Sequence, residues 1–368
     1  MKDSGDIAGT GIPFAAGVAA GALLAALFGH IPLPFPLILS GALPVLVASV
    51  FISAGSLHPQ RAKFAIIFFL TGIFCAANGA FGSGIPIPQG PLGNLAATEC
   101  GRLKSLIDSI PYPSTTSGPL IKALLTGDRS GLDRNITGIF RKSGASHILA
   151  LSGLHLGILY LLLERLTSPL GNSPRARTVR YCLILVASGF YTVMTGASPS
   201  IVRAFLFITI GETARILGRR RNPVGTLLAA LTIQLALNPD VISSLGFQLS
   251  YLAMAGIVTL YPWLEGIYPD SEGLPGRLDP FRKIWKGAVL SISCQVFTAP
   301  LVWFRFHTFP RYFLITNLTA LPLTSAVMVL SVATIALSWA GICPDILIFL
   351  NDKAVSLLVD CLSVISSL

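Results

Sequence analysis

Apolar stretches long enough to cross a bilayer recur from Gly11 to the C-terminus of this 368-residue chain. A helix of about 20 apolar residues spans the hydrocarbon layer, and a spanning segment satisfies its own backbone hydrogen bonds most simply as a helix. Only 11% of the residues are charged, whereas a soluble domain carries about 25%. We therefore expect an all-α, polytopic integral membrane protein of about ten to twelve helices, with amphipathic helices on its outer surface.

The hydropathy pattern predicts where these helices lie. The expected spans are 12–28, 36–52, 64–81, 147–164, 181–196, 200–217, 224–237, 246–261, 287–303 and 312–338, followed by shorter apolar helices at 342–350 and 353–368. This pattern divides the chain into N-terminal transmembrane helices over 1–81, an extracytoplasmic loop over 82–146, and a transmembrane core over 147–368.

The loop over 82–146 combines two amphipathic patterns with an excess of positive charge. The first pattern runs from Leu95 to Ile110, and the second from Leu120 to Leu124, ahead of Gly127. Both indicate helices that lie on the outer surface. The loop holds seven basic residues, namely Arg102, Lys104, Lys122, Arg129, Arg134, Arg141 and Lys142.

These basic residues lie on the unexpected side of the membrane. If the N-terminus is cytoplasmic, the other basic loops all face the cytoplasm, as the positive-inside rule requires, and only 82–146 breaks the rule. Solvation or contact with lipid headgroups accounts for any one of the seven, but together they make a polyanionic ligand a working hypothesis. The residues expected to meet such a ligand first are Arg129, Arg134, Arg141 and Lys142.

Span 147–164 carries polar side chains that a lipid-facing helix would avoid. On one continuous helix, His147, Ser152 and His155 share a face, while Gly153 and Gly157 belong to a separate stripe of small residues where another helix can approach. Polar groups in spans usually face a cavity or another helix. Both interpretations stay open at this point: the groups line a cavity, or they only hydrogen-bond to neighbouring helices.

Further polar groups recur in later spans. Arg203 lies one turn inside a helix that begins near Pro199, where a guanidinium either reaches the membrane interface or receives an anion. The candidate path through the membrane consists of His147, Ser152, His155, Arg203, Gln248, Ser250, Gln295 and Asn317. Few carboxylates occur in the spans, which argues against a proton- or cation-coupled transporter and permits an anionic polymer.

Several motifs in a fixed order resemble the ComEC-type competence proteins of bacteria. They are Leu124-Leu125-Thr126-Gly127-Asp128-Arg129, Ser143 to Gly157, Thr195-Gly196 with Ser200 and Arg203-Ala204, Asn238-Pro239, Gly246 to Ser250, and the set Gln295, Pro300, Asn317 and Pro322. Together they cover about residues 115–330.

This resemblance implies a channel that takes up single-stranded DNA across the cytoplasmic membrane during natural transformation. It also implies two protein partners, a periplasmic DNA receptor and a separate cytoplasmic ATPase, since the chain has no Walker motif. Membrane lipid is the remaining partner, and we expect no cofactor and no metal. Larger family members add an OB-fold domain and a nuclease domain. Here 82–115 is too short for the former and no HxHxDH cluster follows, so we expect the channel module alone.

Two other functions are compatible with parts of the sequence. Ser152 with His155 is reminiscent of an intramembrane serine hydrolase, although a working pair needs the base aimed at the nucleophile and an oxyanion site. An exporter of small solutes or lipids is the other alternative, but no inverted repeat or midplane carboxylate supports it. We therefore expect a protein that is not an enzyme and has no catalytic residue.

Overall fold

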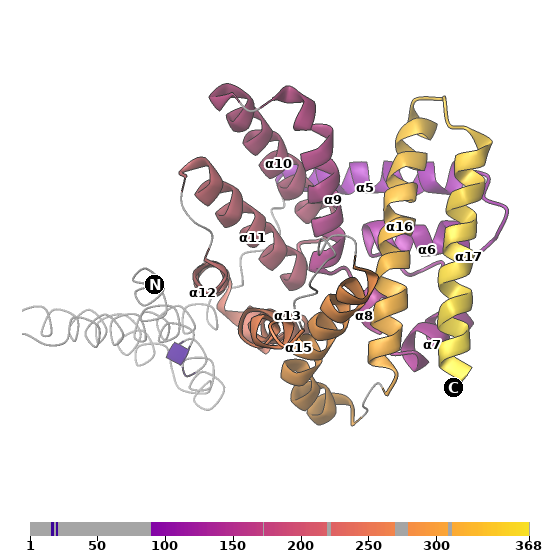
Figure 1. The fold of residues 1–368 in the computed structure, drawn as a ribbon. Coiled ribbons are helices and arrows are strands. Elements are labelled where there is room, and N and C mark those ends of the chain that lie inside the picture. Colours follow the sequence, from indigo (N-terminus) through magenta and orange to yellow (C-terminus); the bar gives the residue numbers. More distant parts are fainter. Residues whose placement is uncertain are drawn as a thin grey trace, which may run out of the picture. The chain divides into compact units, whose positions relative to one another are not determined.

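The computed structural model describes residues 90–368 except 172, 219–221, 269–278, 308–310 and 368, together with residues 16, 17 and 20. The predicted spans 36–52 and 64–81, and most of 12–28, lie outside the described residues. All regular structure in the described part is helical, without a strand (Figure 1). This confirms the all-α prediction.

The chain divides into two compact units. Residues 90–205 and 252–368 form the larger unit, and the described part of the smaller one consists of residues 206–218 and 222–251 together with 16, 17 and 20. The larger unit contains α5 (Pro91–Ser109), α6 (Ser117–Thr126), α7 (Arg134–Lys142), α8 (Ser146–Leu149), α9 (Gly153–Leu166), the 3-10 turn η2 (Ser168–Leu170), α10 (Pro174–Met194), α14 (Tyr261–Glu265), α15 (Pro280–Phe306), α16 (Phe313–Trp339) and α17 (Asp345–Ser367). Two helices, α11 (Pro199–Ile216) and α13 (Leu245–Thr259), run from one unit into the other.

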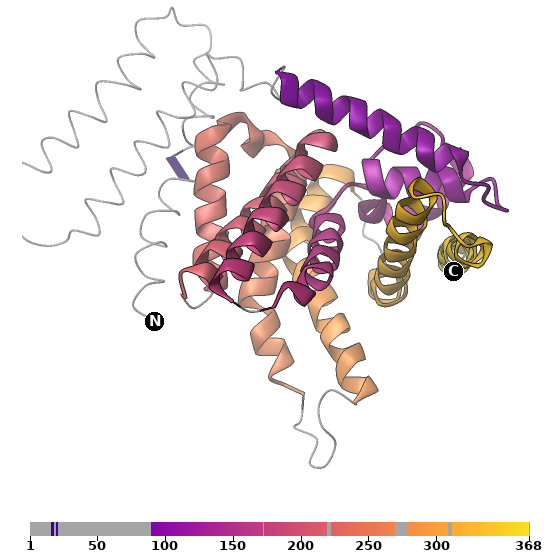
Figure 2. The same cartoon turned by 90° about the horizontal axis from the view of Figure 1, so that it is seen from above.

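The centre of the larger unit is the antiparallel pair α16 and α17. Helices α15 and α9 pack against α16, and α7 packs against α17. Helices α5 and α6 cross this pair steeply (Figures 1 and 2). Apolar side chains from these helices form one shared core, in which Leu124, Phe140 and Leu358 are almost inaccessible to solvent.

Helix α6 corrects one expectation from the sequence. The amphipathic pattern predicts that it lies on the outer surface, but seven of its ten residues are buried, including Leu120 and Ile121. It packs against α16 and α17 as well as α5, because its apolar residues occupy most of its circumference. Helix α5 is the surface helix, since only Ala96 and Ile107 along it are buried.

The C-terminal helices also differ from prediction. The sequence predicts separate helices over 342–350 and 353–368, but α17 is continuous. The polar pair Asn351 and Asp352, which suggests a break, is buried within it. Asp352 Oδ1 accepts hydrogen bonds from Ser114 N at 3.0 Å and Ser117 Oγ at 2.7 Å. Partners on other elements thus let two polar residues sit inside a helix without ending it.

Two described helices are long and apolar enough to cross a membrane, α15 and α16. Each has 27 residues, which at about 1.5 Å per residue exceeds the hydrocarbon thickness of about 30 Å. Asp279 caps α15 by accepting from Phe281 N and Arg282 N, so the helix begins seven residues before the predicted span. The prediction of ten to twelve helices in a membrane stays a prediction.

The smaller unit contains the rest of α11, α12 (Pro223–Leu237), the 3-10 turn η3 (Pro239–Ser243) and the first part of α13. Its core is formed by Leu235, Phe247 and Tyr251, and the two rings lie 4.5 Å apart. Tyr251 OH donates to Gln234 Oε1 at 3.0 Å. Helices α12 and α13 follow the predicted spans 224–237 and 246–261 closely.

Candidate functional site

The predicted span 147–164 is not one helix. Helix α8 ends at Leu149, Ala150 is extended with ψ 130°, and α9 begins at Gly153 after Ser152. The common face expected for His147, Ser152 and His155 is therefore wrong, because the backbone changes direction between the first residue and the other two. His147 is exposed, and its Nδ1 lies 3.1 Å from Gly144 O.

Helix α9 begins at Ser152 because two side chains satisfy the first turn. Ser152 Oγ accepts from Leu154 N at 3.3 Å, and His155 Nδ1 accepts from Ser152 N at 3.1 Å. This reciprocal arrangement is a capping box in which histidine takes the usual place of glutamate. The sequence signal was the spacing Ser-x-x-His ahead of an apolar run, which the continuous-helix interpretation overlooked.

The capping box leaves one polar atom of His155 without a partner. Because Nδ1 accepts from a backbone N–H, the proton of the neutral ring is assigned to Nε2. That Nε2 is buried and has no hydrogen-bond partner among the described residues, and the whole side chain is 1% exposed. A buried donor left unpaired costs about 1–3 kcal/mol, which marks this position as one where function competes with stability.

The helix break is held in place by the segment before it. Gly127 ends α6 with φ 79°, and a Cβ there would lie 2.5 Å from Leu151 Cδ1, so only glycine fits. Arg129 Nε donates to Leu149 O at 3.0 Å, at the end of α8. The Gly127–Arg129 part of the ordered motif therefore packs directly against the break. The sequence predicts that Arg129 meets DNA, but its guanidinium already has a structural bond.

Arg203 approaches the same helix start from α11. Its side chain is only 9% exposed, and a Cβ added to Gly153 would lie 3.1 Å from Arg203 Nη2 and 3.4 Å from Ala204 Cβ. The small-residue stripe thus permits close approach at Gly153, as predicted. At Gly157, an added Cβ would meet nothing within 4 Å. Ser198 Oγ, just before α11, is buried without a partner in the described part of the chain.

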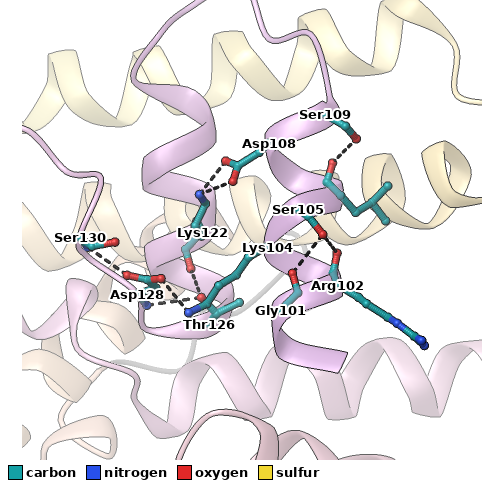
Figure 3. Close-up of polar contacts among 11 residues, drawn as sticks. Gly101, Arg102, Lys104, Ser105, Asp108, Ser109, Lys122, Thr126, Asp128 and Ser130 are labelled. Carbon is teal, nitrogen blue, oxygen red and sulfur yellow. Dashed lines mark hydrogen bonds and ion pairs between the residues drawn. The ribbon is translucent and has the colours of Figure 1, made fainter. Parts of the chain in front are cut away.

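Three of the seven basic residues of the loop are paired with carboxylates, and Figure 3 shows the pairs made by Lys104 and Lys122. Lys104 Nζ lies 2.7 Å from Asp128 Oδ2, Lys122 Nζ lies 2.6 Å from Asp108 Oδ1, and Arg102 pairs with Glu99 one turn away on α5. The hydrogen bond from Lys104 holds the pKa of Asp128 well below its usual range, and raises the pKa of Lys104. Lys122 thus ties α6 to α5, and Lys104 ties α5 to Asp128, whereas the pair of Arg102 and Glu99 lies within α5.

The remaining basic residues gather on α7. Asp133 caps this helix by accepting from Asn135 N at 3.2 Å, and Ile136 and Phe140 are buried on the face toward the core. Arg134, Arg141 and Lys142 are exposed. We call these three residues the α7 basic face. Arg129, the fourth residue of the predicted DNA-contacting set, is also exposed, but its Nε is bonded to Leu149 O.

The other predicted path residues lie in both units. Gln248 and Ser250 belong to the smaller unit, where Gln248 Nε2 donates to Ile242 O at 2.8 Å. In the larger unit, Gln295 Nε2 on α15 and Asn317 Oδ1 on α16 are buried and have no partner among the described residues. Convergence of His155 and Gln248 on a single cleft stays a prediction.

Sequence reasoning missed a structural role for Arg180 on α10. Its Nη2 donates to Thr167 O at 3.1 Å and Gly171 O at 3.0 Å, and the residue is only 7% exposed. The guanidinium therefore satisfies carbonyl groups at the C-terminal ends of α9 and of η2. In the sequence it resembled an ordinary cytoplasmic arginine, and the spacing to its partners gave no signal. No cluster of three or more His, Cys, Asp or Glu side chains suited to a metal ion occurs within the described residues.

Comparisons with known proteins agree with the ordered motifs. A family model described as Competence protein matches residues 124–368. ComE operon protein 3 of Bacillus subtilis (strain 168) is 26% identical over 205 residues, 56% of this chain and 24% of that protein. Competence protein ComA of Neisseria gonorrhoeae is 27% identical over 214 residues, 57% of this chain and 29% of that protein.

A third relative has no assigned function in its name. Uncharacterized protein YcaI of Escherichia coli (strain K12) is 26% identical over 256 residues, 67% of this chain and 33% of that protein. The chain thus matches at most one third of the length of these curated relatives. No solved structure matches this chain.

Proposed function

Because the chain belongs to the competence protein family, we propose that it takes part in DNA uptake and forms a path for single-stranded DNA across the bacterial cytoplasmic membrane. The observation that carries the proposal is the broken helix α8–α9, whose second half begins beside Arg203 with His155 in its first turn. Non-helical backbone at membrane depth is tolerated where protein buries it or where it borders a water-filled cavity.

Exposed apolar side chains support the multi-pass membrane location. Val186 on α10 is 71% exposed, Phe304 on α15 is 75% exposed, and Trp339 at the end of α16 is 81% exposed. Many further large apolar side chains on α9, α15, α16 and α17 are also exposed. So much exposed apolar surface indicates contact with something other than water. Lipid supplies that contact around helices of spanning length.

Polar atoms without partners support a path inside the larger unit. His155, Gln295 and Asn317 each carry a buried polar atom that lacks a partner in the described part of the chain. A protein that only needed to fold would have replaced such groups or paired them. A passing polymer with phosphates, sugars and bases offers the donors and acceptors that these atoms lack.

The α7 basic face supplies the first contact in this proposal. Arg134, Arg141 and Lys142 present three positive charges on one short helix, outside the ion pairs that engage Lys104 and Lys122. Lys/Arg contacts to phosphates release counterions and so draw a polyanion to the surface. A periplasmic DNA receptor would hand the strand to this face, and a cytoplasmic ATPase would supply the driving force.

One contact favours an alternative function, that of a serine hydrolase. Ser152 Oγ and His155 Nδ1 are 3.0 Å apart, within the range of a nucleophile and its base. The same Nδ1, however, accepts from Ser152 N, and Ser152 Oγ accepts from Leu154 N, so helix capping accounts for the contact. Cleavage of a tethered membrane peptide by the purified chain, abolished by Ser152→Ala, would favour the hydrolase. We propose no exporter function, since no observation favours it.

The proposal is tested by deleting the gene from a transformable host and measuring entry of labelled DNA into the nuclease-resistant cytoplasmic pool. We expect entry to be abolished while DNA still binds at the cell surface, and a plasmid copy to restore it. Normal entry in the deletion strain would refute the proposed function.

A further inference from the structure

Helix α15 exposes aromatic side chains near both of its ends. Phe281, at its start, and Trp303, near its end, are both largely exposed. They are about 22 residues apart, which corresponds to ~33 Å at about 1.5 Å per residue and brings both rings to nearly the same side of the helix. The exposed residue Val296, between them, is aliphatic. Aromatic rings separated by about the thickness of the hydrocarbon layer are typical of a helix whose ends lie in the two headgroup layers.

The start of α15 differs from its end because a second helix is fastened to it. The short helix α14 packs against α15. Lys286 Nζ lies 3.0 Å from Glu265 Oε1, and Tyr268 OH donates to Asp279 Oδ2 at 3.0 Å. The rings of Tyr268 and Trp285 are 6.1 Å apart. An ion pair, a hydrogen bond and a ring contact thus hold α14 and the turn after it against the first turns of α15.

This rigid arrangement presents large apolar side chains outward. Trp263 on α14 is 67% exposed, and Ile267, Phe281 and Ile284 are each more than half exposed. We call these four residues the α14–α15 corner. Lys283, between Phe281 and Ile284, is exposed and makes no ion pair among the described residues. Aromatic rings beside a lysine suit a layer that is apolar on one side and charged on the other.

We propose that the α14–α15 corner is an anchor in the headgroup layer of the cytoplasmic leaflet, where Lys283 contacts acidic phospholipid. The first two turns of α15 carry Arg282, Lys283 and Lys286, and basic residues at the end of a span favour the cytoplasmic side. Acidic headgroups attract such residues. Lipid is favoured over a protein partner because the corner continues into the exposed apolar side of a helix of spanning length.

The anchor would fix the depth of α15 in the bilayer, and with it the depth of Gln295, a residue of the predicted path. It rests on the membrane location in the proposed function, but not on the transport of DNA.

Quenching of fluorescence at defined depths tests the anchor. An environment-sensitive fluorescent amino acid replaces either Phe281 or Val296, which is the matched control on the same helix. Both side chains are exposed, so neither replacement disturbs the packing. The full chain is reconstituted in vesicles of phosphatidylcholine and phosphatidylglycerol. The vesicles carry a spin-label quencher either on the lipid headgroup or in the middle of the acyl chain.

The anchor predicts opposite quenching at the two positions. The headgroup label should quench position 281 about twofold more strongly than the acyl-chain label does, and the order should reverse at position 296, since ~22 Å of helix separates them. If iodide in the water quenches position 281 and neither lipid label does, the anchor is overturned and the corner is left to a protein partner. Equal quenching of both positions by the acyl-chain label would also overturn it, because the corner would then lie within the hydrocarbon layer.

A substitution of Lys283 tests the contact with acidic lipid. Adding phosphatidylglycerol to phosphatidylcholine nanodiscs should raise the melting temperature of the full chain, and Lys283→Gln should lose about half of that rise. Lys122→Gln is the control, because Lys122 is paired with Asp108 and its side chain is only 18% exposed. The control should keep the full rise, even if it melts at a lower temperature in both lipids. A full rise in Lys283→Gln would overturn the contact with acidic lipid.

These measurements separate the anchor from the proposed function. If the deletion strain takes up DNA normally while the headgroup label quenches position 281, the proposed function fails and the anchor stands. If uptake needs the chain and the acyl-chain label quenches position 296, but the headgroup label leaves position 281 unchanged, only the anchor fails. If the acyl-chain label does not quench position 296, the membrane location of α15 and the anchor both fail.

Discussion

Two regions of the larger unit bury polar side chains, and they differ in whether those side chains are paired. On α17, Asp352 accepts from Ser114 N and Ser117 Oγ, and Asn351 Oδ1 accepts from Ser331 Oγ at 3.2 Å. At the start of α9, His155 Nε2 is equally buried and has no partner among the described residues.

The difference separates two uses of polarity in apolar surroundings. A buried polar group with all its partners holds elements together, as Asp352 holds the turn between α5 and α6 to α17. A buried polar group without a partner lowers stability and persists where a ligand supplies the missing bond. The basic residues of the loop show the same division, because Lys104 and Lys122 are paired whereas the α7 basic face is open to solvent.

The largest effect is expected at Asp352. Asp352→Ala orphans two donors and should lower the free energy of unfolding by about 3 kcal/mol, measured by thermal unfolding in detergent. Asp360→Ala, at an exposed position on the same helix, is the control and should change little. The folded fraction of Asp352→Ala should bind oligonucleotide normally. Weaker binding by that fraction would remove the distinction between the two regions.

Arg203 should affect transport more than folding. Arg203→Gln is expected to reduce DNA uptake by cells about tenfold or more, and Arg203→Lys by less, since a charged hydrogen bond contributes about 1.5–3 kcal/mol. Membrane abundance is measured in parallel so that misfolding is not scored as impaired transport. An arginine that only anchored the helix at the interface would be replaced by lysine without effect, so full uptake by the lysine variant would contradict the account.

The α7 basic face should account for the salt dependence of DNA binding. Neutralising Arg134, Arg141 and Lys142 to glutamine should lower the slope of log affinity against log salt by up to about 0.7 for each phosphate that the protein no longer neutralises. The matched control neutralises Lys104 and Lys122, whose charges are already paired, and should leave the slope nearly unchanged. If the triple variant and the control variant have the same slope, the α7 basic face contacts lipid headgroups rather than DNA.

The smallest effect concerns pH and the ion pair between Lys104 and Asp128. The folded-state pKa of Asp128 lies below its unfolded value of about 3.9. The stabilisation is therefore present above that pH and disappears as the pH falls toward the folded-state pKa. Lys104→Gln should flatten the acid side of the stability curve, measured by unfolding between about pH 2 and 6. The change should stay below about 1 kcal/mol, because both side chains are partly exposed. If Lys104→Gln leaves the loss of stability at acid pH unchanged, the ion pair between Lys104 and Asp128 is not formed in solution.

The helices could be predicted from the sequence where a long apolar run decides the structure, as in α12, α13 and α16. Prediction failed where polar residues had partners distant in sequence. The predicted break in the C-terminal helix fell at Asn351 and Asp352. Their hydrogen bonds to Ser331 and Ser114, which let the helix continue, cannot be seen in the local sequence.

The candidate site was predicted in part. His155 and Arg203 were identified from their polarity within apolar runs, but the helix break between His147 and His155 was not anticipated. Apolar residues continue through the break, and the capping role of Ser152 depends on a hydrogen bond that hydropathy does not report. The pairing of Lys104 and Lys122 likewise depends on the packing of α5 against α6.

The central claim is that DNA passes the start of α9, and photocrosslinking in living cells tests it most directly. A photoreactive side chain at Gly157, where a Cβ has open space, is compared with one at Val186, an exposed apolar position on α10. During uptake of labelled DNA, we predict crosslinks to the strand from position 157 and none from position 186. Crosslinks from neither position, or equally from both, in cells that take up DNA normally would contradict the account.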